Sequence, residues 1–105
     1  MKETKGSYTM GQWFVKPGRE KEFIAAWKEF ADWTQKSQYG VIEATLLQDT
    51  EDPHLFRSYG NWKDADSINL WRRTPEWKRY YSKLMELCQD VQIRTLKSVA
   101  YLQKR

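Results

Sequence analysis

The stretch "WKDADSINLWRRTPEWKRYY" (residues 62–81) decides how the second half of this chain folds. Asp64 is a residue type that commonly caps a helix, and apolar side chains follow it at helical spacing. Thr74 precedes Pro75, a pair that ends one helix and suits the first turn of another. The stretch therefore predicts a short helix and then a longer one from Pro75 to about Asp90, with an apolar face formed by Trp77, Tyr81, Leu84 and Cys88.

Four strands and one more helix are predicted around this stretch. Residues 41–49 and 55–62 alternate like strands, and the Asp-Pro turn between them predicts an antiparallel hairpin. An earlier strand is predicted over residues 7–15, before a "KPG" turn signal, and a last strand over residues 91–102. The helix predicted over residues 19–36 carries an apolar stripe made by Phe23, Trp27, Phe30 and Thr34.

The order of these elements predicts the fold class. Strand, helix, strand, strand, helix pair and strand is typical of an α+β protein with the ferredoxin-like split βαβ arrangement, in which helices cover one face of an antiparallel sheet. On the first strand Tyr8, Met10 and Phe14 occupy one parity, and Trp13 and Val15 occupy the other. Because both faces of the sheet are then largely apolar, we expect a homodimer in which two sheets pack together.

The size of the chain limits how many aromatic side chains its core can hold. A length of 105 residues predicts one domain, placed over residues 1–105 with an ordered core of about 8–102. Aromatic residues make up 15% of the chain, and six of them are Trp. Because a domain of this size buries only about 60–65% of its unfolded surface, some aromatics are expected to line an interface or a ligand cavity.

Charge and cysteine usage exclude several function classes. The formal net charge of +4 is spread along the chain without long basic runs, which argues against a nucleic-acid partner and weakly favours small anionic ligands. Cys88 is the single cysteine, so an internal disulfide is excluded and an intracellular setting is indicated. No apolar run approaches the ~20 residues needed to cross a membrane. The polar N-terminus lacks a signal peptide's apolar segment, and the prediction is a cytoplasmic protein.

Metal and nucleotide sites are not predicted. His54 is the only histidine and follows a proline in the predicted hairpin turn, where it is expected to be solvated. No group of His, Cys or carboxylate residues has the spacing of metal ligands. The sequence also lacks a phosphate-binding loop, a nucleophile elbow and a dinucleotide fingerprint.

Several segments resemble the antibiotic biosynthesis monooxygenase family of dimeric α/β-barrel proteins. The resemblance covers about residues 8–102 and is carried by "VKPGREKEF" (15–23), "LLQDTEDPHLFRSYGNWKDADSINLW" (46–71) and the final strand. It implies a dimer whose sheets close on each other, with a pocket between sheet and helices in each subunit. Some members oxidise anthrone-, quinol- or naphthol-like aromatics with dioxygen and without metal or flavin. That chemistry needs a water-poor cavity and a few groups that bind the substrate's phenolate.

A related branch of this family binds and degrades haem. It uses an Asn on the first strand, a Trp on the short helix and a His on the next helix as iron ligand. Trp71 matches the Trp, but Tyr81 stands where the His would be and Gly11 where the Asn would be. The resemblance therefore disfavours haem as a cofactor, although a tyrosinate can ligate haem iron.

Trp71 and Tyr81 are the predicted catalytic pair, Trp71 by stacking on the substrate and Tyr81 by binding its phenolate. Each has a structural alternative as a packing residue. Arg57 on the third strand either binds the phenolate or forms a salt bridge, for which Glu43 is the expected partner. The further candidates for contacting the substrate are Trp13, Asn69, Arg72 and Trp77.

These features predict a cofactor-free monooxygenase that oxidises a quinol- or anthrone-like small molecule with dioxygen. The alternative is a non-catalytic protein that holds an aromatic or haem-like ligand in the same pocket. That alternative stays open because the helices that face the pocket carry no ionisable base with a pKa near neutral.

Overall fold

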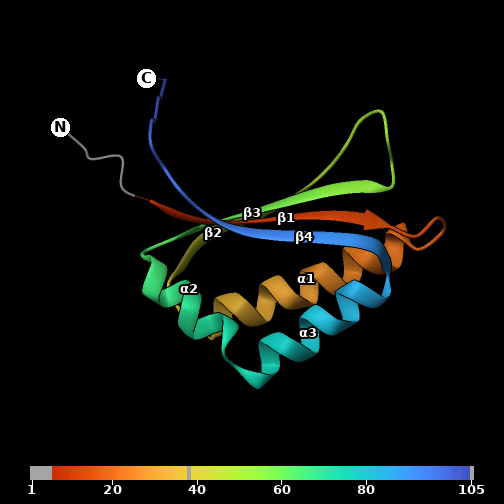
Figure 1. Cartoon of the computed structure of the whole chain (residues 1–105), viewed down its shortest axis with the longest axis horizontal. Helices are drawn as coiled ribbons and strands as arrows, with labels where there is room; N and C mark the ends of the chain where they lie inside the picture. Colours follow the sequence, from red (N-terminus) through yellow and green to blue (C-terminus); the bar gives the residue numbers. More distant parts are fainter. Residues whose placement is uncertain (1–5, 38, 105) are drawn as a thin grey trace.

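The computed structural model describes residues 6–37 and 39–104 as four strands and three helices. Figure 1 shows them as two layers, with the helices together on one side of a single sheet. The elements in chain order are β1 (Ser7–Val15), α1 (Glu20–Lys36), β2 (Val41–Gln48), β3 (Leu55–Trp62), α2 (Ala65–Arg72), α3 (Pro75–Glu86) and β4 (Cys88–Lys97).

The sheet has the strand order β2-β3-β1-β4, and each neighbouring pair is antiparallel. The central strand β1 pairs with β3 on one side and with β4 on the other. β2 and β3 form the predicted antiparallel hairpin. The predicted α+β, ferredoxin-like arrangement is confirmed.

The two caps predicted in the opening stretch are present. The side chain of Asp64 accepts a hydrogen bond from the backbone N–H of Ser67 at 2.8 Å, which starts α2. Thr74 Oγ1 accepts one from the backbone N–H of Trp77 at 3.1 Å, and Pro75 occupies the first turn of α3. The helix pair therefore begins and breaks where the sequence predicts.

The predicted boundary between α3 and the last strand is wrong. α3 ends at Glu86, and Cys88 is the first residue of β4, where it pairs with Val15 of β1. The carbonyl of Leu87 accepts a hydrogen bond from the backbone N–H of Lys16, so sheet contacts take over before another helical turn can form. Leu84 and Cys88 are four positions apart, which suggested one continuous helix. In the structure Leu84 belongs to α3 and Cys88 to β4, and both side chains are buried in the same core.

The end of the last strand also differs from the prediction. β4 ends at Lys97, and residues 98–104 are not part of a strand. The last backbone hydrogen bond joins the N–H of Ser98 to the carbonyl of Gly6. Beyond Ser98 no strand of the described chain lies beside residues 99–104. The alternation of apolar and polar residues that predicted a strand to residue 102 is therefore not enough to extend the sheet.

The core lies between the helices and one face of the sheet. β1 and β3 contribute Trp13, Val15, Phe56 and Trp62, which are buried against side chains from all three helices. Phe23, Ile68 and Leu84 are 0% exposed and represent α1, α2 and α3 in that core. This is the face to which the candidate site belongs.

The other face of the sheet has no helix over it in the described part of the chain (Figure 1). The strand register places Tyr8, Met10, Gln12 and Phe14 of β1 on this face, together with Arg57 and Tyr59 of β3. We refer to it below as the open face. In residues 6–37 and 39–104, no helix is both long enough and apolar enough to span a membrane.

Candidate functional site

Trp71 on α2 is buried in the core between the helices and the sheet. Its ring centroid lies 4.7 Å from that of Trp62 and is stacked 5.4 Å from that of Phe30. Its Nε1 donates a hydrogen bond of 3.0 Å to Thr34 Oγ1, which in turn donates one of 2.8 Å to the carbonyl of Phe30. The indole is therefore fixed in both position and orientation by α1.

A cavity of about 550 Å³ lies on one side of Trp71, between α1 and the β2–β3 half of the sheet. Its apolar wall includes Trp27, Phe30, Trp62 and Trp71. Thr9, Thr34 and Ser58 supply hydroxyl groups, and the charged residues on its lining are Lys28, Asp32 and Glu43. We call it the large cavity.

A second pocket, of about 40 Å³, also borders Trp71. It brings together five residues that the sequence singled out: Trp13, Trp71, Arg72, Trp77 and Tyr81. Trp71, Phe30, Thr9 and Ser58 line both spaces, so Trp71 is a shared wall between them. We call this second space the small pocket.

Tyr81 is held in the small pocket by its neighbours' rings. It stacks on Trp77 with a centroid distance of 4.7 Å and meets Trp13 edge-on at 6.2 Å. Burial raises the pKa of the Tyr81 phenol, and the positive charge of Arg72 acts in the opposite direction. At neutral pH the phenol is therefore protonated and can donate a hydrogen bond.

Arg72 reaches the small pocket from the last turn of α2. Its Nη1 donates to Thr95 Oγ1 at 2.5 Å, and its Nη2 lies 3.5 Å from the carbonyl oxygen of Arg94. Burial lowers the pKa of the guanidinium from its usual value, but the group stays charged at neutral pH. Arg72 Nε and Trp77 Nε1 are buried, and neither has a hydrogen-bond acceptor among the described residues.

Two predicted substrate contacts lie elsewhere. Asn69 is exposed on α2 and is not among the residues that line either space. Arg57 is on the open face, because it pairs with Gln12 and alternates with the buried Phe56. The sheet therefore separates Arg57 from both the large cavity and the small pocket.

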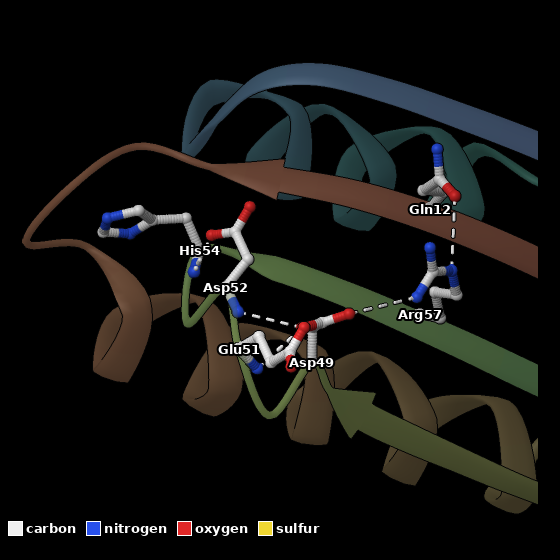
Figure 2. Close-up of polar contacts among 6 residues, drawn as sticks. All are labelled: Gln12, Asp49, Glu51, Asp52, His54 and Arg57. Carbon is white, nitrogen blue, oxygen red and sulfur yellow. Dashed lines mark hydrogen bonds and ion pairs between the residues drawn. The ribbon is translucent and has the colours of Figure 1, made fainter.

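The expected salt bridge between Arg57 and Glu43 is wrong. Figure 2 shows Arg57 between Gln12 and Asp49 instead: its Nε donates to Gln12 Oε1 at 3.3 Å, and its Nη1 lies 3.7 Å from Asp49 Oδ2. Glu43 lies opposite Asn61, farther along the hairpin. The position of Asp49 at the end of β2 puts its carboxylate within reach of Arg57.

Asp49 also organises the turn between β2 and β3. Its Oδ1 accepts backbone hydrogen bonds from Glu51 and Asp52, both at 2.8 Å (Figure 2). These two N–H groups, with a smaller contribution from Arg57, hold the pKa of the Asp49 carboxyl below its usual range. The structure thus gives Arg57 and Asp49 a role in closing the hairpin.

The remaining ionisable candidates have structural surroundings. Cys88 is buried, and burial raises the pKa of its thiol to about 11, so the thiolate needed for a nucleophile is disfavoured. His54 contacts Glu20 through Nδ1 and lies in the hairpin turn, outside both spaces. Within the described ranges, no cluster of three His, Cys, Asp or Glu side chains is arranged to hold a metal ion.

The resemblance led us to expect a pocket between sheet and helices, but the sequence did not identify the residues that line the large cavity, apart from Trp71. The lining of this cavity comes largely from α1 and β2, and none of the predicted substrate contacts except Trp71 borders it. The sequence did carry one signal for it, the surplus of large aromatics on the stripe of α1. Periodicity could not locate the cavity, because the cavity depends on how far α1 stands from the edge strand β2.

Solved structures with this fold come from several microorganisms. A conserved protein from Methanosarcina mazei Go1 has a TM-score of 0.82 at 23% identity, over 90% of this chain and 94% of that one. SnoaB, a cofactor-independent oxygenase from Streptomyces nogalater, has a TM-score of 0.85 at 17% identity, over 95% and 99%. A protein from Pseudomonas aeruginosa has a TM-score of 0.76 at 20% identity, over 95% and 100%. At these identities the likeness shows a shared fold.

Sequence comparison gives a family assignment. No curated protein matches the sequence. The antibiotic biosynthesis monooxygenase family, however, matches residues 7–83, which run from the start of β1 into the last turn of α3 and include Trp71, Arg72, Trp77 and Tyr81. The chain belongs to the antibiotic biosynthesis monooxygenase family.

Proposed function

We propose that this protein is a cofactor-free monooxygenase that oxidises an aromatic compound of the quinol or anthrone type with dioxygen. One observation carries the proposal: Trp71 is a shared wall between a cavity large enough for an aromatic ring system and a pocket that holds Arg72 and Tyr81. The family match and the likeness to SnoaB, a cofactor-independent oxygenase, support the same reaction type.

The large cavity suits an aromatic substrate in size and lining. Its volume of about 550 Å³ falls within the ~300–1,000 Å³ usual for small-molecule sites. Trp27, Phe30, Trp62 and Trp71 offer ring faces and edges against which a flat, apolar molecule can stack. The substrate then lies with one edge against Trp71, next to the groups of the small pocket.

The proposed reaction needs a deprotonated substrate. Loss of a proton to solvent gives a phenolate or enolate whose oxygen lies at the Trp71 end of the large cavity. There the charge of Arg72 and the neutral phenol of Tyr81, in the adjoining small pocket, stabilise the anion. The anion gives one electron to dioxygen, which becomes superoxide, and the two radicals combine by forming a carbon–oxygen bond. The peroxide takes up a proton and loses water to give the ketone, so CH₂ and O₂ become C=O and H₂O.

The residues around Trp71 do not fit the haem-degrading arrangement. Tyr81, which could ligate iron, lines the small pocket of about 40 Å³ and is not on the wall of the large cavity. Gly11 leaves no room for the Asn side chain of that branch, because a Cβ there would lie 2.6 Å from Trp13 Nε1 and 2.8 Å from Ser58 Oγ. No step of the proposed reaction therefore passes through haem.

A non-catalytic aromatic-binding protein is the second candidate. One observation favours it: His54 is the only histidine, and it contacts Glu20 away from both spaces. A binding protein needs no base, whereas an oxygenase without one depends on the acidity of its substrate. Measurement of turnover separates the two functions.

We further propose that the working unit is a cytoplasmic homodimer, each chain forming one domain. The open face carries Tyr8, Met10, Phe14 and Tyr59, and a second copy of the sheet would remove these from water. Arg57 is already paired with Asp49 and Gln12, which lowers the cost of burying its charge in such an interface.

Dioxygen uptake by the purified protein tests the proposed function. A panel of anthrones, naphthols and hydroquinones is supplied, and uptake is compared with autoxidation in the presence of heat-denatured protein. Uptake that rises in proportion to native protein, with one atom of ¹⁸O₂ in the product and one in water, supports a monooxygenase. Saturable binding of these compounds with no uptake above autoxidation would identify a binding protein instead.

A further inference from the structure

Hydrogen-bond donors outnumber acceptors at the small pocket. Arg72 and Trp77 line it; Arg72 Nε and Trp77 Nε1 are buried, and no described residue accepts a hydrogen bond from either. Ser58 Oγ is already an acceptor for Trp13 Nε1 at 3.0 Å, so its own hydroxyl proton is free to be donated. Unpaired buried donors are rare in folded proteins, and each such group calls for a partner that the chain itself does not supply.

The charge at this pocket has one sign. Arg72 is the only charged residue among those that line it, and no acidic side chain borders it. No carboxylate of the described residues lies within salt-bridge distance of Arg72, whose described partners are the hydroxyl of Thr95 and the carbonyl of Arg94. A half-buried guanidinium without a counter-charge favours an anion over a neutral acceptor.

The volume of the small pocket limits the size of its occupant. It measures about 40 Å³, a few times the ~10–15 Å³ that a cavity needs to hold one water molecule. An aromatic ring system is too large for this space. The anions that fit have one to three atoms, such as a halide, azide, or the one-electron reduced form of dioxygen.

We propose that the small pocket is a binding subsite for an anion of one to three atoms, held by Arg72 Nε and Trp77 Nε1. Two N–H donors, one of them on a guanidinium, bind such an anion by charge-assisted hydrogen bonds. Trp71 separates the subsite from the large cavity, so the anion and an aromatic ligand can be bound at the same time. Anion binding itself does not depend on the proposed oxygenase function.

Within that function, the anion that forms beside Trp71 is superoxide, and this assignment rests on the proposed reaction. Superoxide has two atoms and one negative charge, and Arg72 would stabilise it as it forms, before it moves past Trp71 to combine with the substrate radical in the large cavity. The subsite would then favour electron transfer to dioxygen by stabilising its product.

Azide is the probe for the subsite, because it is a three-atom anion that does not need turnover. Isothermal titration calorimetry is run at constant ionic strength with sodium gluconate as the supporting salt, since gluconate is a much larger anion than azide. Wild-type protein is compared with Arg72→Gln, with Trp77→Phe, and with Arg73→Gln. Arg73 is exposed and follows Arg72 directly at the end of α2, so its variant loses the same charge outside the pocket.

We expect saturable binding of one azide per chain to the wild type and to Arg73→Gln. Binding should weaken at least about tenfold in Arg72→Gln and in Trp77→Phe, since each variant removes one donor to an anion. Circular dichroism and thermal unfolding check that the variants are folded. The absence of saturable binding to the wild type, or equal binding to Arg72→Gln and Arg73→Gln, would overturn the subsite.

A second experiment tests which anion the subsite serves. If a substrate is found, azide should raise the apparent KM for dioxygen and leave the apparent KM for the aromatic substrate unchanged. Inhibition competitive with the aromatic substrate, or no inhibition at azide concentrations that saturate the subsite, would overturn the superoxide assignment. If the protein proves to have no oxygenase activity, the calorimetric result still decides whether the subsite exists.

Discussion

Trp71 on α2 and Thr34 on α1 are joined by a buried hydrogen bond, Nε1 to Oγ1 at 3.0 Å, across 37 positions of sequence. Thr34 Oγ1 in turn donates a hydrogen bond to the carbonyl of Phe30, so one hydroxyl links the indole to the backbone of α1. This contact sets the angle of the ring that borders both the large cavity and the small pocket.

Replacement of Thr34 by Val should destabilise the protein by about 1–3 kcal/mol, because the indole N–H of Trp71 is left buried without an acceptor. Val keeps the shape and branching of Thr. The free energy of unfolding is measured by urea denaturation, with Thr50→Val in the exposed β2–β3 turn as the control. In a double-mutant cycle with Trp71→Phe, the double variant should lose less free energy of unfolding than the two single variants together. Strictly additive losses would contradict the proposed coupling between the two side chains.

The rotation of α3 about its axis is tested by two neighbouring residues. Leu84 is 0% exposed and Met85 is 44% exposed. Leu84→Ala should lower the free energy of unfolding by about 2–5 kcal/mol through the cavity it leaves. Met85→Ala should change it by less than about 1 kcal/mol. A larger loss at Met85 than at Leu84 would mean that the helix presents a different face to the core.

The hairpin turn at Asp49 predicts a dependence of stability on pH. The folded-state pKa of Asp49 is lowered, so its contribution is present above the unfolded pKa of about 3.9 and is lost as the pH falls through the folded value. The stability difference between wild type and Asp49→Asn should therefore be constant near neutral pH and shrink at acid pH. Urea denaturation at a series of pH values measures it.

The control for this prediction is Glu51→Gln, in the same turn. Its backbone N–H bonds to Asp49 remain, and only a surface charge is removed. A pH dependence as large in this variant as in Asp49→Asn would contradict a specific role for the Asp49 carboxylate.

The open face of the sheet predicts that the molecule is a dimer in solution. Light scattering during size exclusion should give twice the chain mass of 12.7 kDa. Phe14→Glu should give a folded monomer, since it places a charge on the open face of the central strand. Leu70→Glu, on the exposed side of α2, should remain dimeric. A wild type of single-chain mass would contradict the proposed interface.

The sequence predicted the parts of this fold that depend on local chemistry. Asp64 and Thr74 cap their helices as expected because capping uses a side chain and a backbone N–H a few residues away. The parity of β1 predicted which side chains face the helices, since alternation follows from strand geometry. Five of the seven predicted site residues line the small pocket, because they share the faces of two adjacent helices and β1.

The features that the sequence did not predict depend on long-range geometry. Cys88 was predicted to lie on the last helix, but it begins β4. Both α3 and β4 bury side chains in the same core, so the spacing of apolar residues does not show where the helix ends. Arg57 pairs with Asp49 because the hairpin register brings them together, and a sequence pattern does not contain register. The large cavity lies between elements that are distant along the chain, so it could be located only in three dimensions.

Turnover kinetics of Trp71 and Tyr81 variants are the most direct test of the proposed function. With the best substrate of the oxygen-uptake panel, Tyr81→Phe should lower kcat/KM about 10- to 100-fold through loss of one hydrogen bond to a developing anion. Trp71→Ala should lower it further, because the wall between the two spaces is removed. Leu70→Ala, exposed beside Trp71, should match the wild type. Folded Trp71→Ala and Tyr81→Phe variants with wild-type kcat/KM would contradict the assignment of the site.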